Sequence, residues 1–335
     1  MKEKKSLFLF AFVLCALIVT GSAFAGGGSD ASSTGKANFP ISTAIPPNAP
    51  VTIGLQNFSR DLNATGLFES SVFPSSQLGS INDMIERCIA GDALVQTGDC
   101  ADVADATIKD LSVAQAPFLF KTWEQGDKFL ASSVWKDLCD QVEQKGIKIL
   151  STWSGGSRHI LTKFPVTKLS DLSGKKIRVP NNNNFVRTFN AFGAAPTPLS
   201  LTEVFTSIQQ GVIDGMENPY ADIYSNKFHE VAKYMVEDDY LKQYTTIMVG
   251  VKYYNTLTPE QQKYLVDLCQ LQERVERDIY LKADNEAREN LAKEGVTFTR
   301  LNLDEFIQAI DKSYYPQMTD WTPGLVDKVK AIIAQ

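Results

Sequence analysis

Residues 258–295 carry the longest helical pattern in the chain. Thr258 is a suitable N-cap, Pro259 suits the first turn, and Gln261 completes a capping box. Apolar positions then recur every three or four residues, at Tyr264, Leu268, Leu271, Val275, Ile279, Ala283, Ala287 and Leu291. A helix of roughly 35 residues is about 50 Å long, which exceeds one small lobe, so we expect it to lie across two. A coiled coil is the alternative, but a lone helix with Cys and Ala in its stripe makes a poor zipper.

Residues 1–25 have the pattern of a secretory signal peptide. Three lysines precede an apolar core at residues 7–20, and Ala23-Phe24-Ala25 offers a small-residue cleavage site. The apolar run is shorter than the about 20 residues that a membrane span needs. We expect cleavage after Ala25 and export to the periplasm, with an uncleaved signal anchor as the alternative. No later stretch is apolar enough to span a membrane, so the mature protein is not expected to be membrane-spanning.

Residues 26–50 are rich in Gly, Ser, Ala and Pro and show no apolar periodicity, which predicts a flexible leader. The remaining chain, of about 285 residues, is long enough for two lobes by the usual size of domains.

The charge balance disfavours nucleic acid and anionic membrane as partners. The net charge is −6, and removal of the signal peptide leaves 30 basic and 38 acidic residues. Polyanions would meet a repulsive background, and an anionic ligand would need a local basic pocket.

The cysteines and histidines indicate neither a metal site nor a cofactor. Cys88, Cys100, Cys139 and Cys269 remain after signal removal, and three disulfide pairings are open in an oxidising compartment. A bridge from Cys88 to Cys100 is disfavoured, because the two sit at opposite ends of a predicted helix–strand unit. No CxxC or Cys/His metal spacing occurs, and there are only two histidines.

Strand and helix signals alternate along the rest of the chain. Strands are predicted at residues 51–55, 67–73, 93–97, 147–152, 176–179 and 195–198, with a short one in VIDGMENPY. Helices are predicted from the Ser80 cap to Gly91, at 124–145 and 185–192, and from the Ser200–Glu203 capping box to Gly211. The apolar loop APFLF, residues 116–120, is expected to pack in a core. This alternation predicts an α/β fold with largely parallel sheets.

Arg178 poses a question that the neighbouring sequence does not answer. It lies between Ile177 and Val179 in a predicted strand, with no acidic residue nearby in the sequence. A buried, unpaired charge costs several kcal/mol (order of magnitude), so its partner is either a distant carboxylate or a ligand.

Several segments, in this order, resemble the substrate-binding proteins of tripartite ATP-independent periplasmic (TRAP) transporters. They are FPSSQLGS (73–80), APFLF (116–120), DLSGKKIRVP (171–180), FGAAPTPLSLTEVFTSIQQGVIDGMENP (192–219) and FHEVAKYM (228–235). The resemblance runs from about residue 51 to about 300, and its most specific part is GKKIRVP combined with the downstream VIDGMENP.

The resemblance implies a two-lobed periplasmic binding protein. Each lobe would be a mostly parallel sheet flanked by helices, with the long C-terminal helix bracing both. We divide the chain into a signal peptide (1–25), a leader (26–50), lobe I (51–154 plus 244–283) and lobe II (155–243 plus 284–335). The resemblance also implies capture of a small organic acid and its delivery to a TRAP membrane permease.

The resemblance assigns substrate contacts residue by residue. Arg178 would grip the substrate carboxylate, Asn218 of ENP would hydrogen-bond the same group, and Arg158 of GGSRHI would be a second basic contact. A planar guanidinium fork matches a carboxylate in direction as well as charge. Asp99, after a lobe I strand, and Trp153, at the lobe crossing, complete the candidate site.

Each assignment has a structural alternative. Arg178 could pair with an interlobe carboxylate, Arg158 could be solvated or bridge the lobes, and Asn218 or Asp99 could cap a turn. Trp153 could be hinge packing, and the asparagine run at 181–184 reads most simply as a polar loop and helix start.

One departure from the family pattern concerns the start of lobe I. Family members carry a full helix between their first two strands, whereas only residues 56–66 separate the strands predicted here. A parallel crossover needs a dozen or more residues, so the first helix is expected to be absent or replaced by a turn.

Two other functions compete with transport. An enzyme would need a nucleophile, a base and an orienting group, and no G-x-S-x-G, zinc spacing or close carboxylate pair occurs. We therefore expect no enzymatic activity. A periplasmic sensor component that presents a carboxylate ligand to a signalling receptor is the second alternative.

Overall fold

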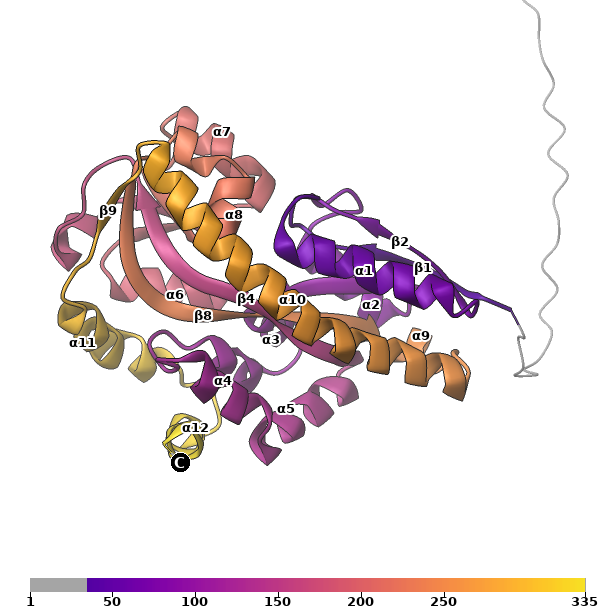
Figure 1. Cartoon of the computed structure of the whole chain (residues 1–335). Coiled ribbons are helices and arrows are strands. Elements are labelled where there is room, and N and C mark those ends of the chain that lie inside the picture. The colour runs from indigo at the N-terminus through magenta and orange to yellow at the C-terminus, as the bar shows by residue number, and fades with distance from the viewer. Residues whose placement is uncertain (1–34, 335) are drawn as a thin grey trace, which may run out of the picture. The chain divides into compact units, whose positions relative to one another are not determined.

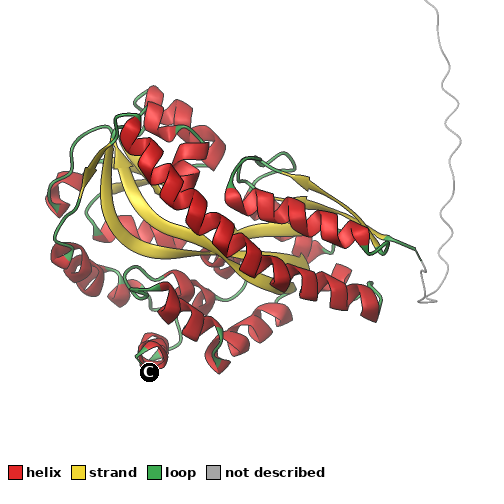
Figure 2. Ribbon diagram, in the orientation of Figure 1, coloured by secondary structure: helices red, strands yellow, loops and turns green. Residues whose placement is uncertain are grey.

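A nine-stranded mixed sheet runs through residues 35–334, the part of the chain that the computed structural model describes (Figures 1 and 2). The signal peptide and the first residues of the predicted leader lie outside this part. The strand order is β2-β1-β3-β8-β4-β7-β5-β6, with β9 paired to β8. The strands are β1 (Ala37–Ser42), β2 (Phe68–Phe73), β3 (Val95–Asp99), β4 (Ile147–Thr162), β5 (Lys176–Val179), β6 (Ala195–Pro198), β7 (Gly215–Asn218), β8 (Tyr234–Gly250) and β9 (Thr297–Thr299).

Two long antiparallel strands, β4 and β8, join the two halves of the sheet. The first half holds β1, β2 and β3 with residues 147–154 and 244–250. The second half holds β5, β6, β7 and β9 with residues 157–162 and 234–242. Three strand pairs are antiparallel: β4 with β8, β3 with β8, and β4 with β7. The other pairs are parallel, as the predicted α/β fold requires.

A β-bulge in β4 marks the change from one half to the other. The register with β8 shifts between Ser154 and Ser157, and Gly156 lies there with φ +84°. A Cβ on Gly156 would lie 2.4 Å from the Tyr280 ring, so only glycine fits. The bulge falls at the predicted boundary between residues 154 and 155, and we propose this point as the hinge.

Helices cover both faces of the sheet, and each face has its own apolar cluster. One face carries α1 (Pro50–Ala64), α7 (Val204–Gln209), α8 (Tyr220–Ser225) and α10 (Pro259–Lys293). The other carries α2 (Ile81–Ala90), α3 (Cys100–Ala106), α4 (Trp123–Leu130), α5 (Ser133–Gln144), α6 (Asn183–Ala191), α11 (Asp304–Ser313) and α12 (Leu325–Ile333). Helix α9 (Val251–Tyr254) follows β8, and 3-10 turns η1 to η5 lie at Lys109–Gln115, Leu169–Leu172, Leu201–Glu203, Phe228–Glu230 and Tyr315–Gln317.

Helix α10 confirms the predicted length but not the predicted buried face. It spans 35 residues, has the Thr258–Gln261 capping box, and packs on α1, β4 and α8, so it contacts both halves (Figure 1). The buried positions are Gln261, Leu265, Cys269, Gln272, Glu276, Tyr280, Ala287 and Leu291. Leu271 is 52% exposed and Tyr264 is 39% exposed, so over most of the helix the buried face is offset from the predicted stripe.

The start of the fold differs from the prediction in three linked ways. Residues 37–42 form β1 rather than part of a flexible leader, and residues 51–55 lie in α1 rather than in a strand. Helix α1 therefore is the crossover between β1 and β2, and the expectation that the first helix is absent is wrong. Pro50 occupies the first turn, and Val51, Leu55, Phe58 and Leu62 are buried at helical spacing.

Most other predicted elements are present, several with changed bounds. As predicted, α2 begins at the Ser80 capping box and ends at the left-handed Gly91, and β5 and β6 match their predicted bounds. The helix predicted at 124–145 is two helices, α4 and α5, and β8 with its 17 residues was not predicted. Helix α12, placed in lobe II by the predicted division, packs against α4, which that division places in lobe I.

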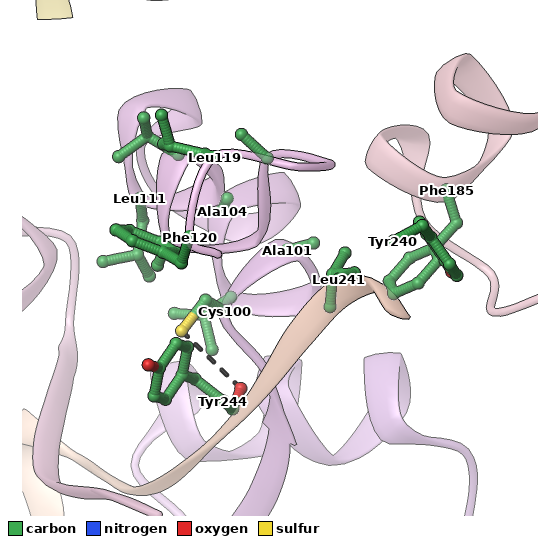
Figure 3. Close-up of a cluster of buried hydrophobic side chains, with 14 of the residues drawn as sticks. Cys100, Ala101, Ala104, Leu111, Leu119, Phe120, Phe185, Tyr240, Leu241 and Tyr244 are labelled. Carbon is green, nitrogen blue, oxygen red and sulfur yellow. Dashed lines mark hydrogen bonds between the residues drawn. The ribbon is translucent and has the colours of Figure 1, made fainter. Parts of the chain in front are cut away.

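The apolar loop APFLF and the Cys100 thiol are both buried in the core beside the first half of the sheet. Leu119 and Phe120 of APFLF are buried in this core, as predicted, and the Phe120 ring packs edge-on against Tyr244 with the ring centroids 6.2 Å apart (Figure 3). The Cys100 thiol donates to the Tyr244 carbonyl at 3.7 Å (Figure 3). All four cysteines in residues 35–334 are free thiols, and Cys88, Cys100 and Cys269 are buried.

Candidate ligand-binding site

A cavity lies where the carboxyl ends of parallel strands from both halves of the sheet meet. Its wall includes Ala44 after β1, Ser76 after β2, Asp99 at the end of β3, Pro180 after β5 and Asn218 at the end of β7. Ligands of open α/β sheets bind outside the carboxyl ends of the strands. The other wall residues, most of which have polar side chains, are Ile45, Ser80, Ile81, Asn82, Thr97, Gly98, Asp102, Arg158, Arg178, Asn181, Leu199, Ser200, Leu201, Asp222, Gln243 and Thr245.

Arg178 lies in this wall with part of its guanidinium unused. It is 4% exposed, and its Nε and Nη2 both donate to the Leu199 carbonyl, at 2.9 and 2.7 Å. Within residues 35–334 no carboxylate forms an ion pair with it. Burial lowers the pKa of Arg178 to about 10, so it stays charged at neutral pH. Nη1 and the second N–H of Nη2 are not used by the Leu199 carbonyl, so this edge of the guanidinium has N–H donors for a carboxylate.

Strand alternation explains why Arg178 faces the cavity. Ile177 and Val179 contribute to the apolar cluster on one face of the sheet. The side chain between them must point to the opposite face. In register, Arg178 lies beside Thr197 of β6 and Met216 of β7.

Asn218 and Asp99 reach the same cavity from opposite halves of the sheet. Asn218 ends β7, is buried, and lines the wall. Asp99 ends β3 at the N-cap position of α3, and its carboxylate accepts from Gln243 Nε2 at 2.9 Å. Burial raises the pKa of Asp99, and the nearby Arg158 opposes this. Asp99 therefore lies in the cavity wall, as predicted, and also occupies a capping position, which was the structural alternative for this residue.

Arg158 also lines the cavity, but most of its donors are spent within the protein. Nε and Nη2 form a bidentate ion pair with the Glu217 carboxylate, Nη2 reaches the Glu217 carbonyl at 3.2 Å, and Nη1 donates to Gln243 Oε1 at 2.6 Å. The guanidinium lies over the Phe185 ring at 4.7 Å, and Asp99 Oδ2 is 3.8 Å from Nη1. At most one N–H is left for a ligand, so Arg158 is a weaker candidate contact than Arg178.

Trp153 lies elsewhere. Its side chain is fully buried in the apolar cluster under α10, and Nε1 donates to the Cys269 carbonyl at 3.2 Å. The structure does not bring Trp153 to the cavity wall, and the alternative of hinge packing describes its position.

Among the wall residues that were not identified from the sequence, Asp102, Gln243 and Asp222 contact or lie near the charged groups of the site. Asp102 follows Asp99 by three residues, which is a capping-box spacing that could have been recognised. Gln243 lies on the unpredicted strand β8, and Asp222 lies on α8 after ENP, where no periodic pattern marks it.

The asparagine run ties the wall of the second half to that of the first. Asn182 caps α6 and donates to Asp102 Oδ1 at 2.8 Å, Asn183 Nδ2 donates to Asp105 at 2.9 Å, and Asn184 Nδ2 donates to the Gln115 carbonyl at 2.8 Å. The run is a helix start, as predicted, and it also holds two parts of the cavity wall together.

Several buried acids have raised pKa values because burial disfavours their charged form. The pKa is about 7 for Asp102 and Asp222 and about 6 for Asp238 and Asp284. Their unfolded values are near 4, so between about pH 4 and pH 7 the folded state binds more protons than the unfolded state. Each of these groups therefore stabilises the fold progressively as the pH falls through that window.

We expect the ligand-free protein to melt at a higher temperature at pH 5.5 than at pH 7.5. Acids with lowered pKa values, such as Glu237 and Asp320, stabilise the fold while they are ionised and lose this stabilisation only below about pH 5. They therefore do not oppose the rise in melting temperature between pH 7.5 and pH 5.5. Melting curves in buffers of equal ionic strength measure the effect. A melting temperature that rises with pH over this range would contradict it.

The described residues add two negative observations. No group of three or more His, Cys, Asp or Glu within 35–334 is arranged to hold a metal ion. No helix in the same range combines the length and the apolar character that crossing a membrane requires.

Comparison with known proteins places this geometry in a family. The model of the bacterial extracellular solute-binding proteins, family 7, matches residues 41–319. A solute-binding protein of Roseobacter denitrificans is 30% identical over 71% of this chain and 73% of its own length.

Two solved structures share the whole described architecture. A TRAP periplasmic solute-binding protein of Actinobacillus succinogenes with bound L-galactonate is 34% identical, with a TM-score of 0.86 over 89% of this chain and 99% of that one. Another, from Ochrobacterium anthropi with bound L-fuconate, is 33% identical, with a TM-score of 0.84 over the same shares. The chain belongs to the family 7 extracellular solute-binding proteins and is a solute-binding protein of the TRAP type.

Proposed function

We propose that this protein captures an acid sugar in the cavity between the two halves of its sheet and delivers it to a TRAP permease. Arg178 carries the proposal, because it is a buried cation in the cavity wall with no carboxylate partner among the described residues. A ligand carboxylate would supply the missing counter-charge. This is the answer we propose to the question that the sequence raised.

The geometry of Arg178 supports a bidentate grip. The Leu199 carbonyl takes the Nε and Nη2 donors on one side, which fixes the plane of the guanidinium. The free Nη1–Nη2 edge can then meet both oxygens of one carboxylate. Asn218 is the proposed second contact to this carboxylate, and Arg158, already paired with Glu217, has at most one N–H to add.

The rest of the wall supports a ligand with several hydroxyl groups. Ser80, Thr97, Ser200, Asn181 and Thr245 offer hydroxyl and amide groups that exchange hydrogen bonds with a polyol chain. The relatives with bound L-galactonate and L-fuconate bind acids of this kind. We therefore favour acid sugars over simple keto acids.

Export and delivery follow from the same assignment. The proposed signal peptide would be cleaved after Ala25, which gives a mature protein that starts at Gly26 in the periplasm. The proposed partner is a TRAP membrane permease, and the sensor alternative is not favoured by the relatives, which are solute-binding proteins of transporters.

Binding of L-galactonate and L-fuconate to the purified mature protein tests the function. We expect dissociation constants of roughly micromolar, near −8 kcal/mol, for at least one acid sugar. At a concentration about 100 times its dissociation constant, the ligand should add about 2.7 kcal/mol to the free energy of unfolding, which is visible as a rise in melting temperature.

Galactose and galactitol are the matched controls, because they carry hydroxyl groups but no carboxylate. Stabilisation by these neutral compounds and not by the acids would reject the carboxylate proposal. Titration calorimetry of the compounds that give shifts would then measure the affinities.

A further inference from the structure

Asp222 is a second unsatisfied group in the cavity wall, of opposite charge to Arg178. It lies on α8, directly after the ENP segment that ends β7, and its side chain is 2% exposed. Its Oδ1 has no hydrogen-bond partner in the described residues. Leaving a buried acceptor unpaired costs about 1–3 kcal/mol, more when the group is charged, so such a group points to a partner that arrives with the ligand.

The other acids of the wall are already engaged. Asp99 accepts from Gln243 Nε2 at 2.9 Å and lies near Arg158. Asp102 accepts from Asn182 Nδ2 at 2.8 Å and from the Asp99 backbone N–H at 2.9 Å. Asp222 therefore differs from them, because its free oxygen remains open to a donor.

The cations of the wall divide in the same way. Arg158 is neutralised by the bidentate Glu217, whereas Arg178 is bound only to a backbone carbonyl. The wall thus holds one cation that lacks an anion and one acid that lacks a donor. Arg178 can accommodate one carboxylate, and a second carboxylate would have no free cation to meet.

The charged and titratable groups around Asp222 strengthen this asymmetry. Burial raises the pKa of Asp222 most, Asp284 and Asp99 raise it further, and Arg158 lowers it. Glu276 and Tyr280 of α10 also interact with Asp222. A further negative charge would enter a region in which acids outnumber cations.

We propose that Asp222 is a specificity-determining residue, which accepts a hydrogen bond from a ligand hydroxyl and excludes ligands with a second carboxylate. The proposal rests on the acid-sugar function and narrows it to monocarboxylates. A hydroxyl donor satisfies Oδ1, whereas a carboxylate brings only acceptors and a like charge, which costs several kcal/mol by order of magnitude. The protein should therefore prefer an aldonic acid over the corresponding diacid.

The test compares L-galactonate with galactarate, the diacid of the same carbon skeleton, by titration calorimetry at pH 8.5, well above the pKa of about 7 of Asp222, so that its carboxylate is ionised. Wild type should bind galactarate at least about 100-fold more weakly than L-galactonate, as a like charge near Asp222 predicts. Asp222→Asn removes the charge, keeps the size and still presents an acceptor. It should weaken L-galactonate by less than about tenfold and strengthen galactarate by about tenfold or more.

Asp238→Asn is the matched control. Asp238 is fully buried, has a raised pKa and accepts no hydrogen bond within the described residues, with His159 Nδ1 3.6 Å from its Oδ1, but it does not line the cavity. The same substitution there should leave the ratio of the two affinities unchanged. Asp222→Ser is a second variant, to be used if Asp222→Asn folds poorly. It should also lower the ratio of the affinity for L-galactonate to the affinity for galactarate.

The outcomes separate this proposal from the function on which it rests. Equal affinities of wild type for both acids, or an unchanged ratio in Asp222→Asn or Asp222→Ser, would overturn the role of Asp222 and leave acid-sugar capture standing. Absence of binding of any acid by wild type would overturn both.

Discussion

Arg178→Ala is expected to reduce the affinity for L-galactonate by at least about 100-fold while the ligand-free protein stays folded. The substitution removes both remaining N–H donors and the charge, and charge-assisted hydrogen bonds contribute roughly 1.5–3 kcal/mol each. The carboxylate would then be buried without a partner. In the ligand-free protein only two hydrogen bonds to the Leu199 carbonyl are lost, and no protein carboxylate within residues 35–334 is left unpaired.

Arg178→Lys separates orientation from charge. Lysine keeps the positive charge but lacks the planar fork that meets two oxygens in parallel. We expect it to bind L-galactonate at least about tenfold more weakly than wild type. Titration calorimetry and ligand-free melting curves of both variants measure the two effects.

The ion-pair alternative makes opposite predictions for these variants. If a protein carboxylate were the true partner, Arg178→Ala would destabilise the ligand-free protein and Arg178→Lys would bind ligand almost normally. Arg187→Lys is a suitable control, because Arg187 forms a bidentate pair with Asp320 away from the cavity. Near-wild-type affinity in Arg178→Lys would refute the role of the fork.

The long helix shows how much the sequence can predict and where periodicity fails. Its length and its capping box follow from local chemistry, because Thr258, Pro259 and Gln261 satisfy backbone groups at the helix start. The buried face does not follow, because Gln272 and Glu276 face the interior while Leu271 and Val275 are exposed. An apolar stripe predicts the face only where apolar side chains supply the contacts.

The misassigned start of the chain has a similar cause. Val51, Thr52 and Ile53 are β-branched, so their local preference favours a strand. Helical spacing of Val51, Leu55, Phe58 and Leu62 and the position of Pro50 overrule that preference in the fold. β1 was missed because residues 26–50 are rich in Gly, Ser, Ala and Pro and show no apolar periodicity. Pro40 is tolerated within β1 because β1 pairs with β3 only at Ile41 and Ser42.

The candidate site divides along the same line. Arg178 could be predicted because an arginine between two buried-type residues poses a charge problem that is visible in the sequence itself. Asp222 could not, because its proposed role depends on which donors are missing around it after folding. Gln243 connects Asp99 to Arg158 only through the long pairing of β8 with β4, which local pattern does not reveal.

Glu217→Ala is expected to lower the free energy of unfolding of the ligand-free protein by about 3–5 kcal/mol, because it leaves a buried charge uncompensated. Arg158 and Glu217 are both almost completely buried, and the carboxylate also accepts from the Tyr240 hydroxyl at 2.5 Å. Removing Glu217 leaves the Arg158 guanidinium and that hydroxyl without this partner. Since natural domains are stable by about 5–15 kcal/mol, the loss is a large fraction of the total.

A double-mutant cycle distinguishes loss of the pair from loss of packing. Glu217→Gln keeps the volume and an acceptor for Tyr240, and Arg158→Met removes the cation. Each single variant should be destabilised, but the double variant should be more stable than the sum of the two effects predicts, because no charge remains unpaired. Glu289→Ala, which breaks an exposed pair with Lys293 on α10, should change the free energy of unfolding by less than about 1 kcal/mol. Urea titrations measure all of these variants, and additive effects in the cycle would show that the pair contributes packing rather than charge compensation.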